Sequence, residues 1–132
     1  MRRIAIGLAA GVAIWVGSAV AAEAQTIQIQ PVGPTAVRAL DISAMVLTDI
    51  TPGSTNTFYV RVKVYVEGEL KYTSPVNGYT TTGTKHYMKN VPLTALGLIP
   101  GKHIVFRTEC SWTNTDQGFV YSAETPAITI GS

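Results

Sequence analysis

The side chains that most often carry out chemistry in proteins are few and scattered in this sequence. Its only two histidines, His86 and His103, lie 17 positions apart on different predicted strands, with no carboxylate or thiol at a metal-binding spacing. Glu67 and Glu69 flank a predicted turn, whereas glycoside hydrolysis needs a cleft between its acid and its base. We therefore expect these four residues to be ordinary surface residues.

Motifs of hydrolases, nucleotide-binding proteins and metalloenzymes are absent from the sequence. It contains no Gly-x-Ser-x-Gly elbow, no phosphate-binding loop, no His-Glu-x-x-His and no acidic calcium loop. The sequence thus predicts a protein that is not an enzyme and that has no cofactor and no metal site. The sole cysteine, Cys110, lies in an alternating strand pattern, which favours a buried thiol over an intermolecular disulfide.

The elements that position these residues are predicted to be β-strands. Residues from 25 onward are rich in Thr, Val, Tyr and Ile, and short alternating runs are broken by Gly, Pro or Asn about every ten residues, as in sandwiches and barrels. Seven antiparallel strands are expected, near residues 26–30, 37–48, 58–66, 69–74, 85–91, 103–113 and 119–130. The fold class is therefore an all-β sandwich.

The connections between these strands carry turn signals of their own. Glu67-Gly68 predicts a tight hairpin, because glycine permits the positive φ that such a turn requires. The threonine-rich stretch 77–83 is expected to be a mobile surface loop. Residues 93–98 are expected to form one short helical turn between Pro92 and Gly97.

The C-terminal part of the sequence follows an order known from one family. Leu98-Ile99-Pro100-Gly101 precedes a predicted strand, Asn114 and Gly118 lie in the loop after it, and Ser122 and residues 126–130 (Pro-Ala-Ile-Thr-Ile) belong to the last strand. This arrangement resembles the end of a fibronectin type III domain, over about a third of the mature chain. The tyrosine of that family falls on Ile104, and residues 37–48 contain no core tryptophan, so a generic immunoglobulin-like sandwich is an equal alternative. Either implies two packed sheets.

The resemblance implies that strands 58–66 and 103–113 are neighbours in one sheet. Alternation predicts that their core-facing residues are Val60, Val62, Val64, Val66, Ile104, Phe106, Thr108, Cys110 and Trp112. The opposite face would then carry Tyr59, Arg61, Lys63, Tyr65, Arg107 and Glu109. Two interpretations stay open for this face: an ordinary solvated sheet surface with cross-strand pairs, or a recognition surface, since Tyr and Arg are favoured in interfaces.

The segment from residue 25 to residue 30 also alternates like a strand. Thr26, Ile27 and Ile29 are interspersed with glutamines, and Pro31-Val32-Gly33-Pro34 then interrupts the pattern. The segment fits an ordinary first strand of its own sheet. It also fits strand exchange, in which it would pair with the sheet edge of a neighbouring copy.

The first 24 residues have the pattern of a secretory signal peptide. Arg2 and Arg3 precede an uncharged apolar run at 4–16, and small residues then lead to Ala22-Glu23-Ala24. We expect a signal helix at 1–24 that is cleaved between Ala24 and Gln25. Cleavage after Ala22 and an uncleaved anchor over 4–22 are the alternatives. Residues 25–132 would then form a single sandwich domain of 108 residues.

Composition narrows the classes of function for this mature part. Its eight basic and seven acidic residues leave a net charge of +1 without a basic cluster, which argues against nucleic-acid binding. We therefore expect a secreted or periplasmic binding or adhesion module with a protein or polysaccharide partner at the cell surface, touching the membrane only through its transient signal peptide. The alternatives are a self-associating subunit of a surface fibre or layer, and a carbohydrate-binding accessory module with Tyr59, Tyr65, Trp112 or Tyr121 as its platform.

Overall fold

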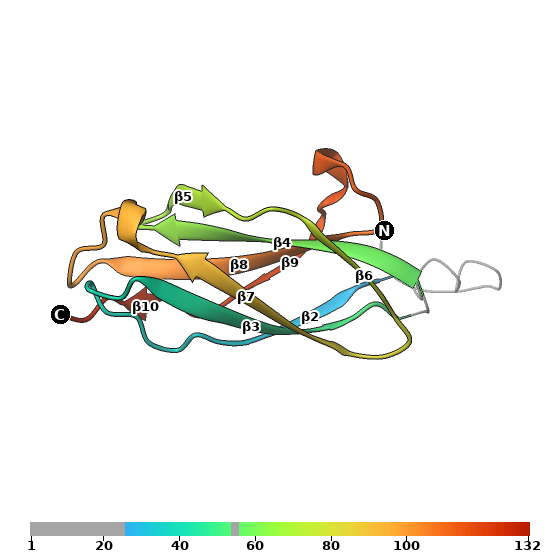
Figure 1. Cartoon of the computed structure of the whole chain (residues 1–132), viewed down its shortest axis with the longest axis horizontal. Helices are drawn as coiled ribbons and strands as arrows, with labels where there is room; N and C mark the ends of the chain where they lie inside the picture. Colours follow the sequence, from blue (N-terminus) through green and yellow to red (C-terminus); the bar gives the residue numbers. More distant parts are fainter. Residues whose placement is uncertain (1–25, 54–55) are drawn as a thin grey trace, which may run out of the picture.

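Two antiparallel sheets packed face to face make up the computed structural model, which describes residues 26–53 and 56–132 (Figure 1). The all-β sandwich expected from the alternating pattern is thereby confirmed. The expected signal helix at 1–24 and the cleavage site at Ala24 and Gln25 lie outside the described residues.

The smaller sheet has three strands in the order β2-β3-β7. These strands are β2 (Gln28–Gly33), β3 (Ser43–Thr51) and β7 (Lys85–Pro92). The strand β3 is central because it pairs with β2 on one side and with β7 on the other, from Ser43↔Pro92 to Ile50↔Lys85.

The larger sheet is built around two long central strands, β4 (Asn56–Val66) and β8 (His103–Ser111). Each has two short strands in succession along its outer edge. Beside β4 these are β5 (Glu69–Thr73) and β6 (Asn77–Thr81), and beside β8 they are β9 (Tyr121–Glu124) and β10 (Ile128–Thr129). The sheet is therefore four strands wide along most of its length.

Two of the predicted connections are confirmed. Glu67 and Gly68 both have positive φ, at 51° and 79°, as a tight hairpin between β4 and β5 requires. Residues Thr94–Leu96 form one 3-10 turn, which ends where Gly97 adopts the left-handed conformation at φ 67°.

The stretch 77–83 is not the surface loop that its composition suggests, because residues Asn77–Thr81 form β6. Its threonines pair across the sheet: the hydroxyls of Thr57 and Thr80 lie 2.7 Å apart. Tyr79 packs its ring 5.9 Å from that of Phe58, measured between centroids. Cross-strand packing thus turns a polar stretch into a strand.

Two predicted strands were too long. The strand predicted at 37–48 begins only at Ser43. Arg38 does not belong to this sheet, because it forms an isolated parallel bridge with Gly131 near the C-terminus. The predicted strand 119–130 is interrupted between β9 and β10, where Pro126 offers no backbone N–H for a ladder.

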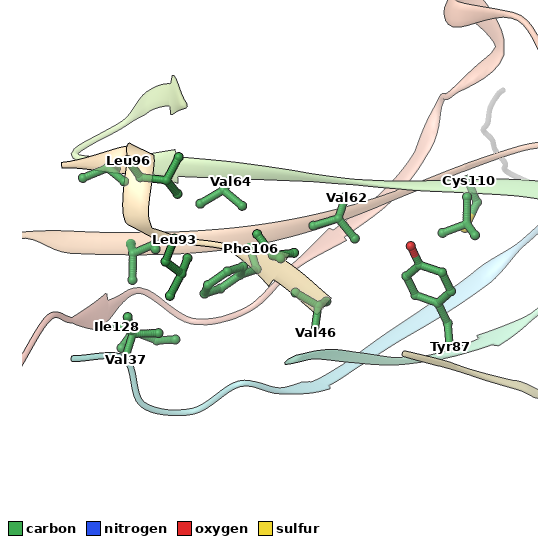
Figure 2. Packing of buried hydrophobic residues seen from close by; sticks show 14 of the residues in the cluster. Val37, Val46, Val62, Val64, Tyr87, Leu93, Leu96, Phe106, Cys110 and Ile128 are labelled. Atoms are coloured by element: carbon green, nitrogen blue, oxygen red, sulfur yellow. The ribbon is translucent and has the colours of Figure 1, made fainter. Parts of the chain in front are cut away.

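The core lies between the sheets and follows the predicted alternation (Figure 2). Val60, Val62 and Val64 on β4 have no exposed surface. Ile104, Phe106, Thr108 and Cys110 on β8 are buried as expected, and Val66 is buried as well, while Trp112 is only partly buried. In Figure 2 the Tyr87 ring spans the layer from β7, with its hydroxyl pointing toward Cys110.

One hydrogen bond joins the two sheets inside this core. The hydroxyls of Thr48 on β3 and Thr108 on β8 lie 2.9 Å apart, and the two residues are 1% and 2% exposed. Thr108→Val is expected to lower the free energy of unfolding by about 1–2 kcal/mol, since it leaves the Thr48 hydroxyl buried without this partner. Chemical denaturation measures the loss. The double variant Thr48→Val/Thr108→Val is expected to lie close to wild type, and additive losses would contradict the coupling.

Candidate functional site

The pairing of β4 with β8 brings together the outward residues predicted for one sheet face. Facing pairs along the two strands are Tyr59↔Ser111, Arg61↔Glu109, Lys63↔Arg107 and Tyr65↔Val105. The six candidate binding residues therefore share one surface, which we call the β4–β8 face. The structure divides this surface into a covered half, around Arg61, and an open half, around Tyr65.

Glu109 is the centre of the charges on the β4–β8 face. Its Oε1 accepts a hydrogen bond from Arg61 Nε at 2.7 Å and lies 3.5 Å from Lys63 Nζ. Its Oε2 lies 3.1 Å from Arg107 Nε, at an angle that makes no hydrogen bond. The Glu109 side chain is only 5% exposed, so a buried carboxylate lies within salt-bridge distance of three cations.

The connection between β8 and β9, residues 112–120, covers Arg61. Asp116 Oδ1 lies 2.5 Å from Arg61 Nη1. The guanidinium carbon of Arg61 lies over the Phe119 ring, 4.2 Å from the ring centroid, as in a cation–π contact. Burial lowers the pKa of Arg61, but its hydrogen bonds to Asp116 and Glu109 outweigh this effect and raise it. The same contact lowers the pKa of Asp116. Arg61 therefore remains charged beneath the loop.

A glycine lets this loop approach the sheet so closely. A Cβ added to Gly118 would lie 2.5 Å from Ser111 Oγ and 2.7 Å from Thr113 Oγ1. Ser111 Oγ is itself engaged, because it donates to the Thr113 carbonyl and accepts from the Thr113 amide at 3.0 Å. Any larger residue at position 118 would have to displace these groups.

The expectation that the whole outward face meets water is therefore wrong for part of it. Arg61 is 9% exposed, because the 112–120 connection lies over it, and its ion-pair partner Glu109 is 4% exposed. Tyr59 is partly buried, and a Cβ added to Gly78, its facing residue on β6, would lie 3.0 Å from the ring. Tyr59 thus packs on the backbone of its neighbouring strand instead of standing free.

The open half of the face contains a hollow of about 310 Å³. It is lined by Tyr65, Gly68, His103, Val105, Arg107 and Glu124. The Arg107 side chain is 34% exposed, and its Nη1 lies 3.7 Å from Glu124 Oε2. Lys63 lies next to the hollow, facing Arg107 across the strands. Two of the six predicted residues, Tyr65 and Arg107, therefore line a concave surface.

Four lining residues were not among the predicted site residues: Gly68, Val105, His103 and Glu124. Glu124 faces Arg107 across the β8–β9 ladder, a register that the sequence does not reveal. Glu67 Oε2 accepts hydrogen bonds from the His103 backbone N–H at 2.7 Å and lies 3.1 Å from His103 Nδ1, which lowers the pKa of Glu67. The sequence indicated this contact only through the predicted strand ends, since Glu67 follows the end of β4 and His103 begins β8.

The two histidines do not form a common site. His86 on β7 belongs to the other sheet, where its Nδ1 lies 2.7 Å from Asp49 Oδ1. Across residues 26–53 and 56–132, three or more His, Cys, Asp or Glu side chains never gather in a way that could hold a metal ion.

Cys110 is buried without exposed surface, and this burial raises the pKa of its thiol to about 12. We expect the folded protein at pH 8 to resist labelling by a thiol-specific disulfide reagent, because almost no thiolate is present and the sulfur is inaccessible. The same sample in denaturant is expected to react with one equivalent. Rapid labelling of the folded protein, or a disulfide-linked dimer on a non-reducing gel, would contradict this expectation.

Of the three residues predicted for strand exchange, Ile29 lies in β2 of the protein's own sheet, and Thr26 and Ile27 directly precede this strand. β2 pairs with β3 from Gln28↔Thr51 onward, Ile27 is 4% exposed, and Ile29 packs against the core, while Thr26 is exposed. This pairing is that of an ordinary first strand. Strand exchange remains a prediction, and sedimentation velocity over a range of concentrations tests it.

Comparison with known proteins found no family model that matches this chain and no matching curated protein. Among the described residues, the structure has no helix that is long and apolar enough to span a membrane.

Proposed function

We propose that this chain is an exported, non-catalytic recognition module that binds a cell-envelope or extracellular partner through the open half of the β4–β8 face. The observation that carries the proposal is the hollow beside Tyr65 and Arg107. Its volume of about 310 Å³ lies at the lower end of the range for small-ligand sites, roughly 300–1,000 Å³. Its lining residues Tyr65 and Arg107 belong to the paired central strands β4 and β8, which fix the positions of an aromatic ring and a guanidinium.

The charges around the hollow support binding over catalysis. A general acid needs a carboxyl group whose pKa is raised toward the working pH. The pKa of Glu67, which precedes the lining residue Gly68, is instead lowered by its bonds to His103. A carboxyl group that stays ionised in this way is a poor general acid, which favours binding over catalysis at this site.

A fibronectin type III-like or immunoglobulin-like relationship is part of the proposal. It is supported by the packing of the three-stranded sheet β2-β3-β7 against a sheet with β4 and β8 at its centre. The turn at Gly101, with φ 91°, precedes β8 as the family pattern implies. Such sandwiches serve many roles, so the ligand has to be inferred from the hollow itself.

Export is supported by the charged, apolar and small-residue order of residues 1–24. The test of function therefore uses the full chain, expressed in a host that exports it, with intact mass identifying the first residue. Processed protein is mixed with isolated cell envelope, and the fraction that sediments is measured. We expect retention of wild type and at least a tenfold weaker retention of Tyr65→Ala, because the variant loses the aromatic wall of the hollow.

Met88→Ala is the matched control for this experiment. Met88 is 65% exposed on β7, in the opposite sheet, so its truncation also removes exposed apolar surface but leaves the hollow intact. Thermal unfolding verifies that both variants are folded. The proposal fails if wild type is not retained, or if Tyr65→Ala and Met88→Ala are retained equally.

A further inference from the structure

We infer that the hollow beside Tyr65 binds a neutral sugar unit of a glycan chain, an inference that rests on the recognition role proposed above. Three properties of the hollow lead to it: an apolar strip across the sheet, a mixed set of hydrogen-bonding groups at its rim, and a balance of charge. The first two properties match the surface of a sugar ring, and the third argues against an anionic ligand.

The apolar strip runs across three adjacent strands. Tyr65 on β4 faces Val105 on β8 inside the hollow. On its other side Tyr65 pairs with Leu70 on β5, after a register shift between Val64 and Tyr65, so Leu70 extends the strip beyond the hollow. Leu70 is 46% exposed, and both Tyr65 and Val105 are partly exposed. A pyranose ring carries C–H bonds on its faces, and these pack against aromatic and aliphatic surface that would otherwise face water.

The rim supplies both hydrogen-bond donors and acceptors. Arg107 can only donate, the Glu124 carboxylate can only accept, and the His103 ring offers a nitrogen of its own. With His103 Nδ1 directed at Glu67, Nε2 is the ring nitrogen left for a ligand. A sugar hydroxyl donates one hydrogen bond and accepts others, so neighbouring hydroxyls on one ring match such a mixture.

Charge balance on this face favours a neutral ligand over an anionic one. The three cations Arg61, Lys63 and Arg107 are matched in number by three carboxylates. Glu109 lies within salt-bridge distance of all three cations, Asp116 of Arg61 and Glu124 of Arg107. A polyanion gains affinity when unpaired cations replace its counterions. Here that gain would require existing ion pairs to be broken.

The class of ligand is tested on the same envelope preparation. One portion is oxidised with periodate, which cleaves vicinal diols of sugars, and another is digested with protease. We expect periodate to reduce retention of wild-type protein at least tenfold and protease to leave it unchanged. We also expect retention to change less than twofold between 0.05 and 0.5 M salt, since a neutral ligand releases no counterions.

Soluble probes extend the test. Affinity gel electrophoresis with neutral β-glucan, galactomannan and arabinoxylan is expected to retard wild type and Met88→Ala in at least one of these gels, and Tyr65→Ala in none. Polygalacturonate is expected to retard none of the three. Sensitivity to protease, a steep dependence on salt, or retardation by polygalacturonate alone would overturn the sugar inference, while envelope retention that depends on Tyr65 would leave the recognition role standing. Absence of all envelope retention would overturn both.

Discussion

Glu109→Gln is expected to lower the free energy of unfolding by about 3 kcal/mol, although the two side chains have almost the same shape. The wild-type carboxylate is 5% exposed and lies within 3.5 Å of Arg61, Lys63 and Arg107. Replacing it with a neutral amide leaves three cations close together, with the hydrogen bond from Arg61 Nε weakened. Thermal and chemical unfolding of the exported protein measure the loss.

Glu124→Gln is the control for this prediction, since it makes the same chemical change on the same face. Glu124 is 49% exposed and its carboxylate is 3.7 Å from Arg107, so we expect a loss of less than about 0.5 kcal/mol. Equal losses of unfolding free energy for the two variants would show that the burial of Glu109 among its three cations does not add to stability. Such a result would contradict the network described above.

Phe106→Ala is expected to have the largest effect of any single change considered, a loss of about 4 kcal/mol. Phe106 is 1% exposed and faces Val64 across the central pair of strands, inside the cluster shown in Figure 2. Its truncation removes buried apolar surface and leaves a cavity that the rigid sheets can close only in part. Small domains are stable by about 5–15 kcal/mol, so a large share of the total would be lost.

Val105→Ala is the control on the next residue of the same strand. Val105 faces outward and is partly exposed, so we expect a loss of less than about 1 kcal/mol. Circular dichroism during urea unfolding gives both values. A smaller loss for Phe106→Ala than for Val105→Ala would contradict the assignment of the two faces of β8.

The features that could be predicted from the sequence are those encoded by neighbouring residues. Alternation along residues 58–66 assigned each side chain of β4 to a face, because a strand repeats every two residues whatever its partners are. The hairpin at Gly68 and the turn ended by Gly97 depend on the local freedom of glycine at positive φ. Such local signals can be interpreted without knowledge of the tertiary structure.

The candidate binding face shows where local signals end. The sequence predicted correctly that Arg61 and Glu109 are on the same side of the sheet, yet both are buried where exposure was expected. Arg61 is covered by Phe119, 58 residues further along the chain, in a connection that looked like an ordinary loop. Only the path of that connection, which depends on the close approach of Gly118 to Ser111, decides which half of the face is open.

The hollow likewise depends on contacts between distant segments. Tyr65 and Arg107 were identified from their strand positions, whereas Glu124 joins them only through the register of β9 on β8, and His103 through its bonds to Glu67. Alternation and turn chemistry are properties of a few consecutive residues, so sequence alone determines the faces of a strongly alternating strand such as β4, whereas the polar strand β6 forms only through its pairing with β4. Register, loop placement and burial depend on which remote groups meet, so they are decided only when the two sheets pack together.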